Sequence, residues 1–393
     1  MPFLERWKSM RGHSTFSKMK WLLYKALWLD LLKEGVIYGN GALRKINDST
    51  CAVENYRQPK EIVCITGFGH SGSGAVIDLL SEYDCTCVEG YVDKNGSLRK
   101  EAGREFDILR HAGGIFCLEN AVQNKNPFVQ DASVKLFLAL IANHYDDPRC
   151  SYRDVLVNST RRFLEEILDF SLPSRWGYDF CPHMNFMSDR GYELIFDQPD
   201  SIRQAIFFLR DMPVNEYRLA ARRFLALIFG NLASDKILVL DQAISDGTAD
   251  MQKYQEYLEN MKLIAVWRDP RDVFVTANIK GEAWIPRDVH TFIKWYGRIV
   301  PYLTMCDPNY KLIRFEELVL DYDNEVSGIE EFIGLDFNDH IASKSAFDPD
   351  VSSKNIGIYK QHLNEFGKEI KIIEDGLRDF LFNELEDIGR KYV

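Results

Sequence analysis

A glycine-rich stretch between two apolar segments constrains the fold of this chain more than any other feature. Residues 64–80 read CITGFGHSGSGAVIDLL. The run EIVCIT that leads into the glycines (61–66) is short, apolar and β-prone, which predicts a buried strand. Residues 75–83, after the glycines, predict a helix. A strand, a glycine-rich loop and a helix in this order are the opening of an α/β fold.

The loop has the spacing of a phosphate-binding loop but not its usual residues. Gly67 and Gly72 stand as in G-x-x-x-x-G-K-[ST], yet Ser73 takes the lysine position and Gly74 that of the magnesium-binding hydroxyl. Glycines let the backbone approach an anion, and the start of the helix directs free amides at it. A tight turn without a ligand is the alternative. The residues predicted to bind an anion are Gly69, His70, Ser71, Gly72, Ser73 and Gly74.

A second candidate anion site lies at residues 266–278, which read VWRDPRDVFVTAN. Arg268 ends a strand-like run just as a helix begins, because Asp269 is a good N-cap and the proline after it fits the first helical turn. Thr276 follows two turns later on the same helix face. An arginine and a hydroxyl therefore converge, which indicates a second phosphate site. The alternative is a salt bridge from Arg268 to Asp272.

Short apolar runs alternate with helical patterns on both sides of a long central block. This alternation predicts a parallel sheet covered by helices on both faces, with its ligand at the carboxyl ends of the strands. Residues 100–235 are mostly helical in pattern, including 155–170 and 201–212, and predict an inserted lid or acceptor-binding part. Residues 369–385 predict a C-terminal amphipathic helix. The further predicted strands lie within 85–89, 236–242, 262–269 and 310–318.

Residues 1–60 are predicted to form an amphipathic helix and a polar connector ahead of the main domain at 61–393. The helix, over 14–32, has lysines close to its apolar face. It therefore either packs on the domain or lies on an anionic membrane surface. Its apolar run is too short and too charged to span a membrane, and no small-residue cleavage site marks a secretory signal.

Charge and cysteine usage exclude some classes of function. The net charge of −11 disfavours a general nucleic-acid binder, which would be basic. The eight cysteines include no C-x-x-C pair, and such usage suits a reducing cytoplasm. Cys85 and Cys87 form a single C-x-C, which is typical of small residues on a buried strand rather than of a metal site. The sequence therefore predicts a cytoplasmic protein without a bound metal.

A third segment, SSKNIGIYK at residues 352–360, completes a family resemblance. The three segments together resemble the sulfotransferases that use 3'-phosphoadenosine 5'-phosphosulfate (PAPS). Residues 67–73 match the family loop G-x-x-[RK]-[ST]-G-[ST], except that His70 takes the basic position. Residues 268–273 match the family run R-D-P-R-D-V, and Thr276 replaces its final serine.

The resemblance covers roughly residues 61–89 and 236–385 and implies a P-loop-like sulfotransferase fold. It implies transfer of a sulfuryl group from PAPS to a hydroxyl without a divalent metal, which fits a loop that lacks the magnesium-binding hydroxyl. The 5'-phosphosulfate would bind the first loop. The residues that it assigns to the rest of the nucleotide are Arg268, Thr276, Ile356, Gly357 and Lys360.

Two residues carry the predicted chemistry. His70 would stabilise charge on the leaving group as a hydrogen-bond donor or as imidazolium. Glu89 would be the general base, since the chain is similar to carbohydrate sulfotransferases that often place a glutamate there. The implied acceptor is a carbohydrate or glycoconjugate of a polysaccharide pathway. A solvated Glu89 is the alternative, and a P-loop kinase and an inactive PAPS-fold scaffold are the other functions. Weaker candidates for the base are His111, His144, His183, Glu119 and Asp241.

Overall fold

The computed structural model describes most of the chain after its first 58 residues. The predictions for the helix at 14–32 and for Glu89 lie outside the described residues. The described ranges are 59–88, 108–109, 114–147, 150, 152–173, 182–196, 205–233, 235–244, 251–258, 261–282, 285–299 and 307–383.

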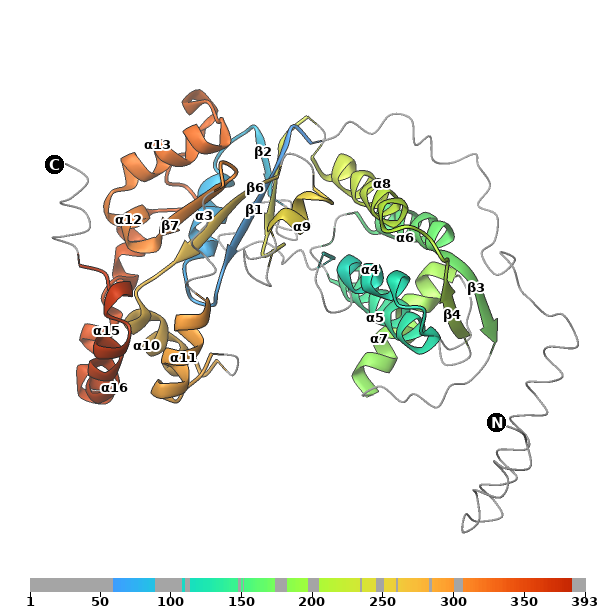
Figure 1. Ribbon diagram of the computed structural model, residues 1–393. Coiled ribbons are helices and arrows are strands. Elements are labelled where there is room, and N and C mark those ends of the chain that lie inside the picture. Colours follow the sequence, from blue (N-terminus) through green and yellow to red (C-terminus); the bar gives the residue numbers. More distant parts are fainter. Residues whose placement is uncertain are drawn as a thin grey trace, which may run out of the picture.

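A five-stranded sheet forms the centre of the protein (Figure 1). Its strands run in the order β2-β5-β1-β6-β7, and every neighbouring pair is parallel. The predicted α/β architecture with a parallel sheet is thus confirmed. The strands are β1 (Glu61–Gly67), β2 (Thr86–Val88), β5 (Ile237–Asp241), β6 (Met261–Trp267) and β7 (Tyr310–Arg314).

Side chains alternate between the two faces of the sheet, so each strand contributes to two cores. On β1, Val63 and Ile65 pack against one set of helices. Ile62 and Cys64 point the other way, into the core of the central helical block. Both faces are therefore covered, which explains why these strands are apolar at almost every position. The helices of the first set are α3 (Ser73–Leu80), α12 (Phe315–Leu320) and α13 (Tyr322–Ile333).

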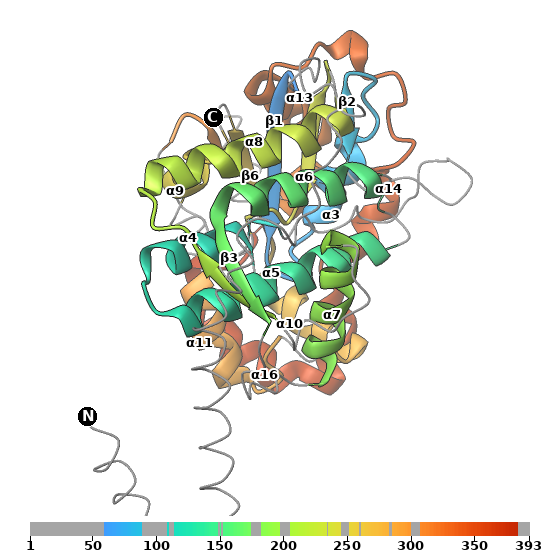
Figure 2. The same ribbon diagram turned by 90° about the vertical axis from the view of Figure 1, so that its right-hand side faces the viewer.

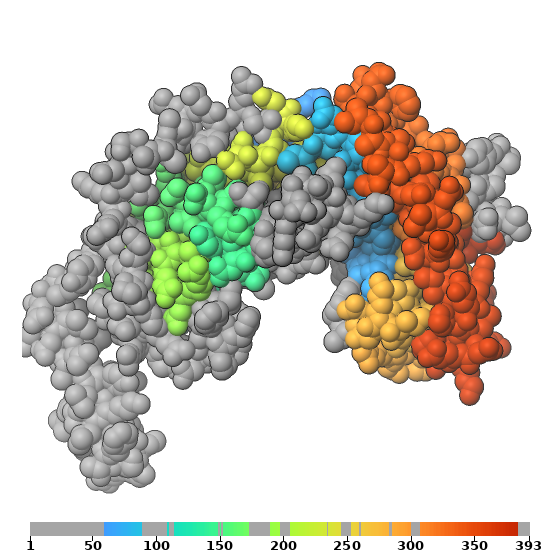
Figure 3. Space-filling view, turned by 180° about the vertical axis from the view of Figure 1, so that it is seen from behind, coloured from blue at the N-terminus to red at the C-terminus, as the bar shows by residue number. Residues whose placement is uncertain are grey.

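The central block lies across the second face of the sheet (Figure 2). It contains five helices among the described residues and a two-stranded antiparallel ribbon. The helices are α4 (Ile115–Gln123), α5 (Pro127–Asp146), α6 (Arg153–Ile167), α7 (Pro182–Phe196) and α8 (Val214–Ala233); α9 (Met251–Gln255) follows β5. Seen from behind, the surface is hollowed between this block and the helices that follow β6 (Figure 3).

The ribbon corrects the helix predicted over 201–212, and it shortens the helix predicted over 155–170, which the structure ends at Ile167. β3 (Leu168–Pro173) pairs with β4 (Ala205–Leu209), whose sequence is AIFFL. The backbone amides of Phe207 and Leu209 donate to the side chains of Asp131 and Gln130 on α5, at 3.1 Å each. Buried partners thus satisfy the ribbon, and a short apolar run cannot be assigned to strand or helix from periodicity alone.

Helices that follow β6 and β7 surround the carboxyl edge of the sheet. α10 (Pro270–Lys280), α11 (Val289–Ile299) and α16 (Leu363–Gly376) share an apolar core with Phe68, the residue after β1. The short helices α14 (Pro349–Ser352) and α15 (Ile358–Gln361) precede α16. Within the described ranges, no helix has the length and apolar character needed to cross a membrane.

The C-terminal helix lies earlier than the predicted range of 369–385. α16 ends at Gly376, and a 3-10 turn, η7 (Arg378–Phe380), follows it. The backbone of Phe382 is held by other groups: its N–H donates to Asp269 at 2.9 Å and its carbonyl accepts from Arg271 at 3.3 Å. These tertiary contacts replace the bonds that a longer helix would need.

Candidate functional site

The first loop joins β1 to α3 at the carboxyl edge of the sheet. Gly72 is the N-cap of α3 with φ 94°, and no side chain of the described residues caps this helix. A Cβ at Gly72 would lie 2.4 Å from the Phe315 ring, so only glycine fits this close approach. The start of α3, where the sequence predicts an anion, thus has no side-chain cap among the described residues.

Arg268 connects this loop to the other elements of the site. Its Nη1 donates to the carbonyl of His70 at 3.2 Å, and its Nη2 donates to the carbonyl of Asn355. Nη2 also lies 3.7 Å from a carboxylate oxygen of Asp272, so the alternative interpretation of Arg268 is part of the observed geometry. The guanidinium lies over the ring of Phe315, 5.2 Å from its centroid.

The start of α10 has the predicted cap. The carboxylate of Asp269 accepts from the backbone N–H of Arg271 at 2.8 Å, and Pro270 is the first helical residue. Thr276 lies further along α10 and is 9% exposed. Its hydroxyl is buried and has no hydrogen-bond partner among the described residues. An unpaired buried hydroxyl in a site is a group that a ligand can satisfy.

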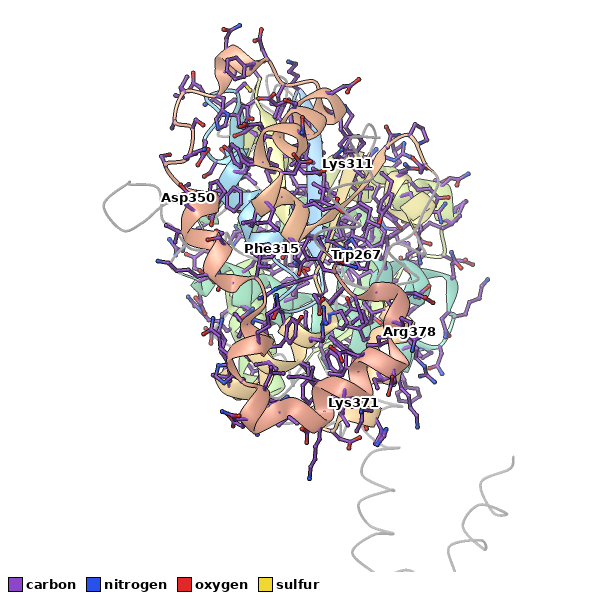
Figure 4. All side chains as sticks on the ribbon, turned by 90° about the vertical axis from the view of Figure 1, so that its left-hand side faces the viewer. Trp267, Lys311, Phe315, Asp350, Lys371 and Arg378 are labelled. Atoms are coloured by element: carbon purple, nitrogen blue, oxygen red, sulfur yellow. The ribbon has the colours of Figure 1, made fainter. Side chains whose placement is uncertain are left out.

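One cleft of about 710 Å³ opens between the first loop, α10 and the segment 344–358. The first loop contributes His70, Gly72 and Gly74, and the β6–α10 junction contributes Arg268 and Thr276. The two predicted anion sites are therefore parts of one cavity. Phe315 also lines it, and Figure 4 shows Phe315 near the centre of its face of the molecule.

Several predicted residues do not line the cleft. Gly69, Ser71 and Ser73 belong to the first loop but do not line the cleft. The buried hydroxyl of Ser71 has no hydrogen-bond partner among the residues that the structure describes. The hydroxyl of Ser73 accepts from the side-chain amide of Gln242 at 3.0 Å. The loop thus supplies mainly backbone and His70 to the cavity.

The third predicted segment, residues 352–360, borders the cleft, but not through the three residues that were predicted to bind the nucleotide. Ile356, Gly357 and Lys360 do not line the cavity, whereas Asn355 and Ile358 do. The N–H of Gly357 donates to Asp272 at 2.7 Å, and Lys360 is exposed. The roles of Ile356, Gly357 and Lys360 in nucleotide binding stay predictions.

His70 lies at the wall of the cleft in a strained conformation. Its φ is 60°, a value that residues with a side chain rarely adopt. Burial, followed by the positive charge of Lys280, lowers the pKa of its imidazole, while Glu282 opposes this change and Arg268 adds to it. His70 is thus neutral at pH 7 in the protein without ligand, and the predicted imidazolium would require a bound anion.

Strained backbone marks Gln242, at a strand end that the sequence places near the ligand, and Lys344, which sequence reasoning missed. Gln242 has φ 51° and Lys344 has φ 61°; the first holds Ser73 and the second lines the cleft. Such strain often marks functional sites, because the surroundings must hold it in place. Lys280 was also missed, although a signal existed: it follows Thr276 by four residues on one helix and so shares its face.

A single buried carboxylate holds the opposite wall of the cleft. Glu82, just after α3, accepts backbone N–H groups from Lys344 at 3.0 Å and from Ala346 and Phe347 at 2.8 Å each. The ring of His340 lies 2.7 Å from the same carboxylate. The sequence contains no local signal for this anchor, because it joins residues about 260 positions apart.

Two weaker candidates for the base have structural partners instead. Glu119 accepts two hydrogen bonds from Arg218, at 3.0 and 3.1 Å, and one from Tyr257. His144 is fully buried in α5, and its ring centroid lies 6.1 Å from that of Tyr152. Neither lines the cleft. In the part of the chain that the structure describes, no three His, Cys, Asp or Glu side chains gather as metal ligands would.

Comparison with known proteins finds only remote similarity. No family model and no curated protein matches the chain. Among solved structures, it is similar to the sulfotransferase domain of the Synechococcus PCC 7002 olefin synthase, with 10% identity, coverage of 75% of this chain and 78% of that one, and a TM-score of 0.33. The sulfotransferase STF1 of Mycobacterium tuberculosis shows 12% identity, 81% and 76% coverage and a TM-score of 0.32. The sulfotransferase domain of the curacin biosynthetic pathway shows 11% identity, coverage of 82% of this chain and 98% of that one, and a TM-score of 0.33. These scores are too low to support a function.

Proposed function

We propose that this protein transfers a sulfuryl group from PAPS to a hydroxyl of a carbohydrate or glycoconjugate. One observation carries the proposal: the first loop and the Arg268–Thr276 pair line the same cleft. The guanidinium of Arg268 bonds the carbonyl of His70 at 3.2 Å, so the two anion sites are in direct contact. A ligand with anionic groups at both ends of a ribose can therefore engage both.

The residues of the cleft suit an adenosine bisphosphate. The open start of α3 would hold the 5' group, and Arg268 with the unpaired hydroxyl of Thr276 would hold the 3'-phosphate. The ring of Phe315 offers an apolar surface to the base. Gly74 lacks the hydroxyl that holds magnesium in ATP-binding loops, which disfavours a kinase.

In the proposed reaction, an acceptor oxygen bonds to sulfur while the bond from sulfur to the 5'-phosphate oxygen breaks. Adenosine 3',5'-bisphosphate (PAP) leaves, and the proton of the acceptor hydroxyl passes to a base. His70 would stabilise the charge on the departing phosphate oxygen. Glu89, the proposed base, lies outside the described residues.

The acceptor class rests on weaker support. The helical block at 100–235 remains our proposed acceptor-binding part, and the hollow between it and the helices after β6 offers room for a large substrate (Figure 3). A glycan of a polysaccharide pathway is the proposed acceptor. We further propose a cytoplasmic location, in which residues 14–32 either pack on the protein or lie on a membrane surface.

Two measurements on the full chain test the proposal. The melting temperature should rise when PAP is added without magnesium. It should change little when ATP is added, with or without magnesium. ³⁵S-labelled PAPS should pass its label to a glycan in an extract of the source cell. Stabilisation by magnesium-ATP but not by PAP would indicate the kinase instead. Binding of PAP without transfer of label to any glycan would indicate the inactive scaffold.

A further inference from the structure

Glu282 is held beside the cleft by the end of α10. Gly281 caps this helix with φ 76°, and its N–H donates to the carbonyl of Ala277 at 3.0 Å. The N–H of Glu282 donates to the same carbonyl at 3.1 Å. A doubly bonded helix end of this kind fixes the backbone of the residue after the glycine. The backbone of Glu282, two residues after Lys280, is therefore fixed in position.

His70 is held from the opposite side. Its carbonyl accepts from Arg268, and its strained backbone directs the imidazole to the cleft wall. The side chain of His70 is only 14% exposed, and its Nε2 lies 3.8 Å from a carboxylate oxygen of Glu282, which is 35% exposed. Two rigid elements, the first loop and the end of α10, thus bring an imidazole and a carboxylate together.

Charges of both signs act on His70. Lys280 on α10 and Arg268 after β6 disfavour its cationic form, and Glu282 favours it. Burial adds to the unfavourable side and is the largest cause of the lowered pKa. The other charged residues that line the cleft are Asp78 on α3 and Lys344 and Asp348 on the facing wall.

We propose that Glu282 is a positioning residue for His70, orienting the imidazole and pairing with its cationic form when phosphate groups enter the cleft. The part that concerns the ligand rests on the proposed function. A bound phosphate would offset the charges of Arg268 and Lys280, so the attraction of Glu282 would then favour a proton on His70. The proton is taken up from solvent. Protonated His70 would thereby place a positive charge at a loop position that has no lysine or arginine.

The test is an NMR titration of His70 in the full chain with labelled histidine, its signal assigned from His70→Gln. Without nucleotide, Glu282→Gln should lower the pKa of His70, and Lys280→Gln should raise it. Glu331→Gln is the matched control, because Glu331 is an exposed glutamate on α13, away from the cleft lining. It should leave the titration unchanged. An unchanged midpoint in Glu282→Gln would overturn the pairing.

A second measurement concerns the ligand. PAP should raise the pKa of His70 in the wild type and less in Glu282→Gln. At pH 7 that variant should bind PAP about two- to five-fold more weakly, the range expected of a partly exposed ion pair. Equal affinity and equal proton uptake in both proteins would overturn the role of Glu282 in binding. Failure of PAP to bind the wild type would overturn the proposed function, whereas the titration without nucleotide would still decide the pairing.

Discussion

Replacement of Thr276 by valine should separate ligand binding from stability. Thr276 lines the cleft, and its buried hydroxyl has no hydrogen-bond partner in the part of the chain that the structure describes. An unpaired buried hydroxyl costs about 1–3 kcal/mol, so its removal should raise the free energy of unfolding by about 1 kcal/mol or more. Valine also keeps the branched shape of threonine, so the packing of α10 should persist.

The same change should weaken binding of PAP. A hydrogen bond to a charged group contributes about 1.5–3 kcal/mol, which corresponds to a roughly 10- to 150-fold increase in Kd. The matched control is Thr160→Val, because the hydroxyl of Thr160 is likewise buried and has no hydrogen-bond partner within the described ranges, but it lies on α6, away from the cleft lining. This control should leave the affinity for PAP unchanged.

Calorimetric titration with PAP and chemical denaturation of both variants give the two quantities. The reasoning predicts a loss of affinity in Thr276→Val alone, with no loss of stability in that variant. Equal affinity in wild type and Thr276→Val would refute the assignment of Thr276 to a phosphate. A large loss of stability in Thr276→Val would show that the hydroxyl has a structural partner.

Two further changes test the loop and the buried Glu316, whose carboxylate accepts from the backbone N–H of Asp269 at 2.9 Å. Gly72→Ala places a Cβ 2.4 Å from the ring of Phe315 at φ 94°, so it should lower the melting temperature and abolish the thermal shift by PAP; normal binding would contradict the role of this turn. Burial raises the pKa of Glu316 to about 7 from its ordinary value of 4.5, so the native state binds more protons than the unfolded state between these values. Stability should therefore fall as pH rises from 5 to 8, by on the order of 3 kcal/mol from this group. Denaturation of Glu316→Gln should show a flatter pH dependence, and parallel curves for both proteins would argue against a titrating Glu316.

Much of the site could be predicted because its signals are local. The glycine-rich turn after β1, the aspartate cap and the strand-end position of Arg268 each depend on residues that are neighbours in the chain. Parallel strands then place both segments at one edge of the sheet. The predicted meeting of the two anion sites followed from these facts.

Other parts of the site could not be predicted because their partners are distant in the chain. Lys344 reaches the cleft because Glu82 binds the backbone around it. The position of Gly357 depends on Asp272, which takes its N–H. No periodicity or motif connects the members of these two pairs, which lie 262 and 85 positions apart, so the pairs appear only after the chain has folded.

The sequence by itself determined the α/β class, the first loop and the start of α10, because propensity, capping and turn geometry act between near neighbours. Only the tertiary structure decided which groups face the cleft, that residues 205–209 form a strand, and that Glu282 lies beside His70. Those outcomes depend on burial and on hydrogen bonds between separate elements. Such bonds form where packing brings the groups together, whatever their separation in sequence.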